Sequence, residues 1–179
     1  MKNHTRLYKL VSIALTAAGI AVIAPFSVPI GPVPLSLASL GCMLAVYLLS
    51  YPGAVYAAAI YLLLGFSGLP VFSGFTGGFQ KLAGPTGGYL LGYLLLTGIA
   101  GWFSEKLNGE KKGYLPGFLI GNAALYALGT VWLMLETGLT LKKALFAGVL
   151  PFLPGDAVKI CLAMKLGPLL RDRIRRRKD

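Results

Sequence analysis

Charged residues are scarce in this chain of 179 residues. They make up 13% of the sequence, whereas a soluble domain carries about 25%. Acidic residues are the scarcest, with 6 against 17 basic residues and a formal net charge of +11. The apolar residue types account for 56% of the chain, and the mean hydropathy is +0.72. A soluble domain has no core large enough for this composition, so the sequence predicts a small integral membrane protein.

Groups that carry common enzyme chemistry are absent or isolated. His4 is the only histidine and precedes the first apolar run, which removes histidine catalysis and ligation from the membrane interior. Cys42 and Cys161 stand alone in apolar runs, so we expect no disulfide framework, metal or cofactor. No Gly-Lys dipeptide occurs, which excludes a Walker A loop. The sequence predicts a protein that is not an enzyme; a Ser–Lys hydrolase using Lys159 stays open, although no serine is marked out.

The apolar residues fall into six runs. At about 20 apolar residues for each transmembrane helix, the composition supplies five or six spans. The runs cover residues 10–24, 35–51, 54–66, 88–103, 114–135 and 144–170. Pro52-Gly53 is predicted to turn the second run into the third, and Pro151 and Pro154 interrupt the last. We predict an all-α integral membrane protein with six transmembrane helices, forming a single domain over residues 1–179.

Basic residues divide unevenly between the two sides of that arrangement. Three lie in the head before the first run, three in the connector 104–112 and six in the tail 171–179. With six spans these segments share one side, and only Lys81, Lys142 and Lys143 fall on the other. Because basic loops stay in the cytoplasm, both termini are predicted to be cytoplasmic. The tail is then an anchor for anionic lipid.

Asp156 and Lys159 are charged residues deep within an apolar run. Each costs about 2.5 to 3.5 kcal/mol at the centre of a bilayer. Three positions apart, the two side chains share one face of a helix. Pro154 suits an early helix position, which places Asp156 in the first turn, where a carboxylate is favoured. The pair either holds a break in the helix as a structural ion pair or faces a ligand pocket, and we favour the pocket.

A glycine-rich stretch over residues 67–87 lies between the third and fourth runs and repeats Thr-Gly-Gly. Glycine lets a backbone turn tightly and approach a ligand closely. A flexible loop is the plain alternative, but the stretch is too apolar for a solvated linker. It is therefore predicted to cap a substrate. Its apolar side chains include Val71, Phe72, Phe75 and Phe79, and Ser73, Thr86 and Tyr89 supply hydroxyl groups in it or directly after it.

Two other helices carry patterned residues. Asn122 and Tyr126 are four apart in the fifth run and can face one cavity. Glycine pairs in the fourth and fifth runs have the small-xxx-small spacing of close helix packing. The first run contains two such pairs, Ala14 with Ala18 and Ala17 with Ala21. Either pair lets another helix approach, from this chain or from a partner.

The sequence resembles the BioY family, the biotin-specific S-components of energy-coupling-factor (ECF) transporters. The resemblance covers nearly the whole chain. Its most specific segments are residues 68–72 (GLPVF) with Gly77-Gly78, residues 84–93 (GPTGGYLLGY), and Pro154-Gly155-Asp156 with Lys159.

This resemblance implies the S-component fold and a function in the bacterial plasma membrane. The subunit is expected to capture biotin with high affinity from outside and to work with a coupling transmembrane subunit and two cytoplasmic ATPase subunits. Asp156 and Lys159 match ligand-binding residues of the family, and Ala14 with Ala18 matches its docking motif, with Ala17 and Ala21 as the other register. Polar ligand contacts are expected from among Ser73, Gln80, Thr86, Tyr89 and Tyr93, and Asn122 is a further candidate.

Biotin suits such a pocket. Its ureido ring has two N–H donors and a carbonyl acceptor, which a carboxylate and an ammonium group can satisfy together. Its apolar parts would pack against Phe72, Phe75, Tyr89 and Tyr126. Alternatively, Lys159 pairs with the carboxylate of biotin. A self-sufficient secondary transporter with Asp156 as proton carrier and a non-transporting structural protein are the rival functions.

Overall fold

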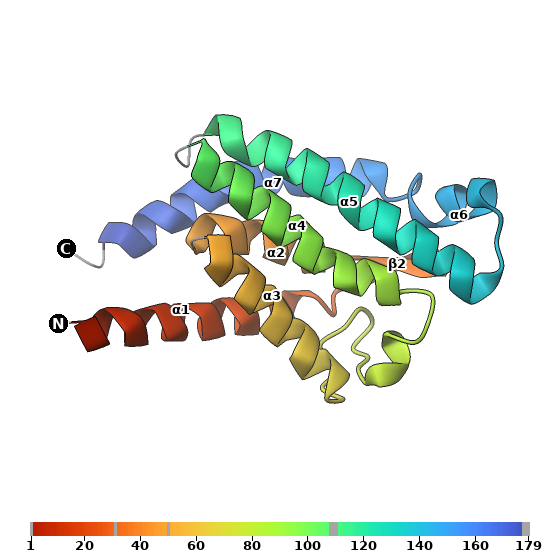
Figure 1. Ribbon diagram of the computed structural model, residues 1–179, viewed down its shortest axis with the longest axis horizontal. Coiled ribbons are helices and arrows are strands. Elements are labelled where there is room, and N and C mark those ends of the chain that lie inside the picture. The colour runs from red at the N-terminus through yellow and green to blue at the C-terminus, as the bar shows by residue number, and fades with distance from the viewer. Residues whose placement is uncertain (1, 31, 50, 108–110, 177–179) are drawn as a thin grey trace.

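The computed structural model describes residues 2–30, 32–49, 51–107 and 111–176, in which seven α-helices and one β-hairpin follow one another (Figure 1). The elements are α1 (Lys2–Ile23), β1 (Ser27–Ile30), β2 (Val33–Ser36), α2 (Ala38–Leu48), α3 (Tyr51–Phe66), the 3-10 helix η1 (Phe79–Lys81), α4 (Gly87–Lys106), α5 (Lys111–Thr137), α6 (Leu141–Gly148) and α7 (Leu153–Arg176). The predicted basic tail and the connector between the fourth and fifth runs lie partly outside the described residues, at 177–179 and 108–110.

Both termini lie at the same end of the long axis, and α6 lies at the opposite end (Figure 1). Within the described residues, two helices are long and apolar enough to cross a membrane, at Arg6–Ile23 in α1 and Gly113–Thr137 in α5. The α6–α7 pair, bent by 46°, makes a third if it is one span. α2 and α3 are apolar but shorter. The count of six spans therefore stays a prediction.

The segment between α1 and α2 corrects the expectation of an all-helical chain. β1 and β2 pair in antiparallel register, from Ser27 opposite Ser36 to Ile30 opposite Val33. Pro29 lies opposite Pro34, and a two-stranded ribbon tolerates prolines because its outer edges need no N–H donor. The second apolar run therefore begins as a strand and becomes helical only at Ala38.

The turn between the second and third runs lies a few residues before Pro52-Gly53, where the sequence predicted it. α2 ends at Leu48 and α3 begins at Tyr51, so Pro52 and Gly53 occupy the first turn of α3. Proline fits there because the first N–H groups of a helix have no partner within it.

α4 and α5 pack closely, as the glycine spacing predicts. A Cβ atom added at Gly92 would lie 2.8 Å from Leu125 Cγ, and one at Gly121 would lie 2.9 Å from Leu96 Cδ1. One added at Gly88 would overlap Trp132 and come within 2.9 Å of the Leu128 carbonyl. Only glycine permits this approach, so the two helices form a closely packed pair.

The glycine-rich stretch is folded against the rest of the chain. Phe72 is only 1% exposed, and its ring occupies the space that a side chain at Gly65 would need. The Gly78 N–H donates to the Gly65 carbonyl at 2.7 Å, and the Gly74 N–H donates to the Pro25 carbonyl at 2.9 Å. These contacts fix the stretch against α3 and the connection between α1 and β1.

Candidate functional site

The break between α6 and α7 places two charged side chains inside the protein. α7 begins at Leu153, with Pro154 second and Asp156 in its first turn, as predicted. The Asp156 N–H donates to the Phe152 carbonyl at 2.8 Å. Because a helix carries partial positive charge at its N-terminus, this position favours the Asp156 carboxylate. The carboxylate thus begins the helix, and Lys159 follows one turn later.

Four polar side chains form a buried cluster at this point. Lys159 Nζ lies 2.8 Å from Asp156 Oδ1 and donates a second hydrogen bond to Ser39 Oγ at 3.0 Å. The Tyr126 hydroxyl donates to Asp156 Oδ2. Asp156 is 7% exposed, and Lys159 and Ser39 are each 5% exposed. The cluster joins α2, α5 and α7, and every charge in it is compensated.

A small cavity adjoins the cluster. Its volume is about 40 Å³, little more than the roughly 30 Å³ that one water molecule occupies in the liquid. Its lining residues come from β2, α2, α4, α5 and the start of α7; they are Val33, Pro34, Leu35, Ser36, Ser39, Tyr89, Tyr93, Leu125, Tyr126, Phe152, Asp156 and Lys159. A vitamin-sized ligand therefore requires this cavity to expand.

Besides Tyr126, the structure brings three other polar candidates to or near this cavity. Tyr89, Tyr93 and Tyr126 line it. Asn122 is 5% exposed, and neither its amide oxygen nor its amide nitrogen has a hydrogen-bond partner among the described residues. It lies one helical turn from Tyr126 on α5 and is not among the residues that line the cavity.

The candidates from the glycine-rich stretch over residues 67–87, called the capping segment from here on, lie apart from the cavity. Phe72 contacts Tyr61, with ring centroids 5.7 Å apart, and Tyr61 contacts Tyr93 at 6.4 Å. Phe75 is 60% exposed and contacts Phe26 edge to face at 5.5 Å. The Tyr61 ring thus lies between Phe72 and the cavity-lining Tyr93.

The polar candidates of the capping segment do not reach the cavity. Gln80 is exposed on η1. Thr86 Oγ1 donates to the Lys81 carbonyl at 3.3 Å, and the Ser73 carbonyl accepts from Thr76 Oγ1 at 2.9 Å. In this conformation these residues contact their own segment.

The sequence analysis missed Ser39 and the β2 wall. Ser39 is one hydroxyl in an apolar run and carries no charge that would mark it. Ser36 Oγ donates to the Ala24 carbonyl at 2.6 Å and accepts from the Ala38 N–H at 3.0 Å, which ties the hairpin to α1 and α2. The sequence offered one signal for this part of the site, which is the pair Ser36 and Ser39 at the start of the second apolar run.

The two alanine pairs of α1 face different surroundings. Ala17 is fully buried within this chain, and Ala21 is half-buried. Ala14 and Ala18 are exposed. The exposed pair is therefore the one accessible to another helix. Among the described residues no group of three His, Cys, Asp or Glu side chains could hold a metal ion.

Comparisons with known proteins agree on one family. The model of the BioY family matches residues 1–176. The biotin transporter BioY2 of Lactococcus lactis is 38% identical over 168 residues, covering 92% of this chain and 91% of the relative. The biotin transporter BioY of Thermotoga maritima is 38% identical over 155 residues, covering 87% and 90%.

The fold has a solved counterpart. The crystal structure of the S-component for biotin from an ECF-type ABC transporter matches with a TM-score of 0.88 and 30% sequence identity. The match covers 96% of this chain and 95% of that chain. The mostly helical fold is thus that of an S-component.

Proposed function

The chain belongs to the BioY family, and we propose that it is the biotin-binding membrane subunit of an ECF-type uptake transporter. As a member of a family of biotin transporters, it is a membrane protein and not an enzyme. The observation that carries the proposal is the buried cluster of Asp156, Lys159, Tyr126 and Ser39. It supplies charged donors and acceptors within an apolar interior.

The chemistry of the cluster matches the ureido ring of biotin. The Asp156 carboxylate can accept from a ureido N–H, and the Lys159 ammonium can donate to the ureido carbonyl. The pair is neutral overall, as the ring is. A second pose pairs Lys159 with the biotin carboxylate. In either pose the ligand replaces the hydrogen bonds between Asp156 and its partners Lys159 and Tyr126, while Ser39 keeps its hydrogen bond to Lys159. The aromatic rings of Tyr89, Tyr93 and Tyr126 cover the apolar parts of the ligand.

Binding also requires the cavity to open. α4 and α5 are closely packed, so their wall is poorly suited to move. The rest of the lining comes from β2, Ser39, Phe152 and the Asp156–Lys159 pair. The capping segment is tied to Pro25, two residues before the hairpin, by the Gly74–Pro25 hydrogen bond. We propose that the hairpin and the capping segment move together, which brings Phe75, Thr86 or Gln80 toward the ligand when the site closes.

The proposed assembly follows from the family. The chain forms one membrane domain over residues 1–179 with six spans and both termini in the cytoplasm of a bacterium. It captures biotin with high affinity on the outer side of the plasma membrane. The exposed pair Ala14 and Ala18 docks a coupling transmembrane subunit, and two cytoplasmic ATPase subunits drive transport. The basic tail anchors the cytoplasmic end to anionic lipid.

A calorimetric titration of the purified protein in detergent tests the ligand. Biotin should bind tightly, dethiobiotin should bind through the same ureido group, and riboflavin and thiamine should not bind. No heat of biotin binding in demonstrably folded protein would contradict the proposal.

A transport assay separates the proposal from a self-sufficient secondary transporter. Cells expressing the complete transporter should lose biotin uptake on ATP depletion. Uptake that survives ATP depletion but collapses with a protonophore would instead indicate proton coupling through Asp156.

A further inference from the structure

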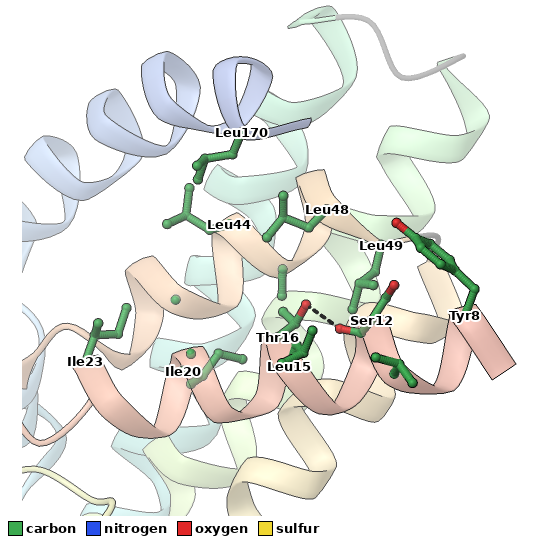
Figure 2. Close-up of a pocket in the computed structure, with 14 residues that line it drawn as sticks. Tyr8, Ser12, Leu15, Thr16, Ile20, Ile23, Leu44, Leu48, Leu49 and Leu170 are labelled. Carbon is green, nitrogen blue, oxygen red and sulfur yellow. Dashed lines mark hydrogen bonds between the residues drawn. The ribbon is translucent and has the colours of Figure 1, made fainter. Parts of the chain in front are cut away.

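An apolar groove runs along α1 at the side facing α2 and α7. Its volume is about 630 Å³, within the roughly 300–1,000 Å³ typical of ligand sites. Figure 2 shows Leu170 of α7 above Leu44 of α2, with Thr16 and Ile20 of α1 on the other side. The Thr16 hydroxyl donates to the Ser12 carbonyl of its own helix at 2.8 Å, so this face of α1 presents mainly hydrocarbon to the groove.

A second, polar cavity adjoins the groove near the end of the molecule that holds both termini. Its volume is about 380 Å³. Leu48 and Leu49 line both spaces, and Leu170 of the groove precedes Arg171 of the polar cavity. The polar cavity is also lined by Tyr47, Tyr51, Ser104, Glu105 and Tyr114. A hydrocarbon slot and a polar recess thus share one wall.

The polar cavity contains fixed donors and acceptors. Arg171 Nη1 donates to the Tyr114 hydroxyl at 3.1 Å, and the Tyr114 ring stacks on Tyr47 with centroids 3.8 Å apart. Glu105 Oε1 accepts from the Tyr51 N–H at 3.1 Å. The guanidinium group is therefore positioned by an aromatic pair, and its planar fork of donors suits a phosphate group.

The surrounding charge favours an anion. Arg6 and Lys9 on α1 and Arg173 on α7 are exposed, as is the acidic Asp172, and no acidic residue occurs in the sequence before Glu105. Basic pockets between transmembrane helices on the cytoplasmic side suit anionic lipid head groups.

We propose that the two spaces together bind one anionic phospholipid, with an acyl chain in the groove and the phosphate at Arg171. Among anionic phospholipids, Glu105 favours those with a hydroxylated head group. Its carboxylate accepts hydrogen bonds from hydroxyl groups and repels a head group that carries a second negative charge. Phosphatidylglycerol has this chemistry. The site shares no lining residue with the Asp156–Lys159 cavity, so the proposal stands independently of the transported ligand.

Native mass spectrometry of the full chain tests the proposal. The protein is equilibrated in mixed micelles with equal amounts of phosphatidylglycerol and diacylglycerol, which has the two acyl chains but no phosphate. We expect one retained phosphatidylglycerol, favoured about tenfold, because a charge-assisted hydrogen bond of this kind changes affinity by about that factor. Arg171→Gln should abolish the head-group preference. Its matched control is Arg173→Gln, which removes an exposed charge of α7 that does not line the cavity.

The groove is tested separately by Gly19→Leu. A Cβ atom at Gly19 meets nothing within 4 Å, so the leucine enters the groove without displacing the chain and should abolish retention of both lipids. The control is Gly98→Leu on α4, where a Cβ atom makes only one ordinary contact, 3.9 Å from Val55.

Several outcomes would overturn the proposal. They are equal retention of the two lipids, an equal loss of preference in Arg173→Gln, and lipid retention that survives Gly19→Leu while association with a coupling subunit is lost. Displacement of the lipid by glycerol 3-phosphate, the head group without chains, would also overturn it, because the polar cavity would then be a site for soluble anions.

Discussion

The cavity at Asp156 has one wall that is closely packed and one that is loosely held. On the α4–α5 side, the space for a side chain at Gly92 is filled by Leu125. On the other side, β2 belongs to a two-stranded hairpin that the Ser36–Ala24 hydrogen bond ties to α1. A hairpin of this size is marginally stable by itself. Because the cavity is far smaller than a vitamin, the contrast indicates which wall yields when a ligand enters.

Gly88→Leu breaks the closely packed wall and should have the largest effect. A leucine at this position meets Trp132 and the Leu128 carbonyl, and α4 and α5 cannot separate without losing their contact. We expect the free energy of unfolding to fall by about 3 kcal/mol or more, the upper end of what overpacking substitutions cost. The measurement is the midpoint of thermal unfolding in detergent, which should be lower. Gly98→Leu on the same helix is the control and should leave the midpoint nearly unchanged. An equal loss in both variants would mean that the α4–α5 contact is not special.

Ser39→Ala sharpens the comparison at the cluster itself. It removes one hydrogen bond to the Lys159 ammonium, and hydrogen bonds to charged groups contribute about 1.5–3 kcal/mol. Because this hydroxyl holds the ammonium group in position for the ligand, we expect biotin affinity to fall in a titration. The matched variant Ser36→Ala removes a hydroxyl that bonds only backbone groups. It should lower the unfolding midpoint more than the affinity, and the reverse pattern in the two variants would contradict these roles.

Phe75→Ala weakens the loosely held side and should have the smallest effect. The edge-to-face contact with Phe26 is worth about 0.5–1.5 kcal/mol, and Phe75 is already 60% exposed. We expect biotin to dissociate several-fold faster in stopped-flow experiments, with little change in unfolding. Phe79→Ala is the control, because Phe79 is 67% exposed and has no ring contact among the described residues. Unchanged dissociation in Phe75→Ala would mean that the capping segment does not retain the ligand.

The sequence revealed the scaffold of the fold more readily than the loosely held wall. Long apolar runs located α4 and α5 to within a few residues, and the spacing of Gly88 and Gly92 indicated their contact. The hairpin was missed because Pro29 and Pro34 indicate a loop, and pairing two short strands depends on tertiary contacts. The six-span count rested on composition, while the helices α2 and α3 are shorter than a typical span.

The site was predictable where charge marked it. A carboxylate and an ammonium group three positions apart in an apolar run must meet compensating partners, which identified Asp156 with Lys159. The helical spacing brought Tyr126 to the same place. Ser39 lies about 120 positions earlier in the chain than Lys159, and no local pattern reports a contact over that separation.

The central claim is that Asp156 and Lys159 hold biotin. The most direct measurement is a titration of biotin into the wild-type protein, Asp156→Asn, Lys159→Met and the double variant, with thermal unfolding as the check of folding. Each single variant should weaken biotin binding by at least about tenfold. The fold-loss of affinity in the double variant should be smaller than the product of the two single fold-losses, because the residues act as one pair. Wild-type affinity in folded single variants would contradict the claim and leave the pair as a structural support of the break between α6 and α7.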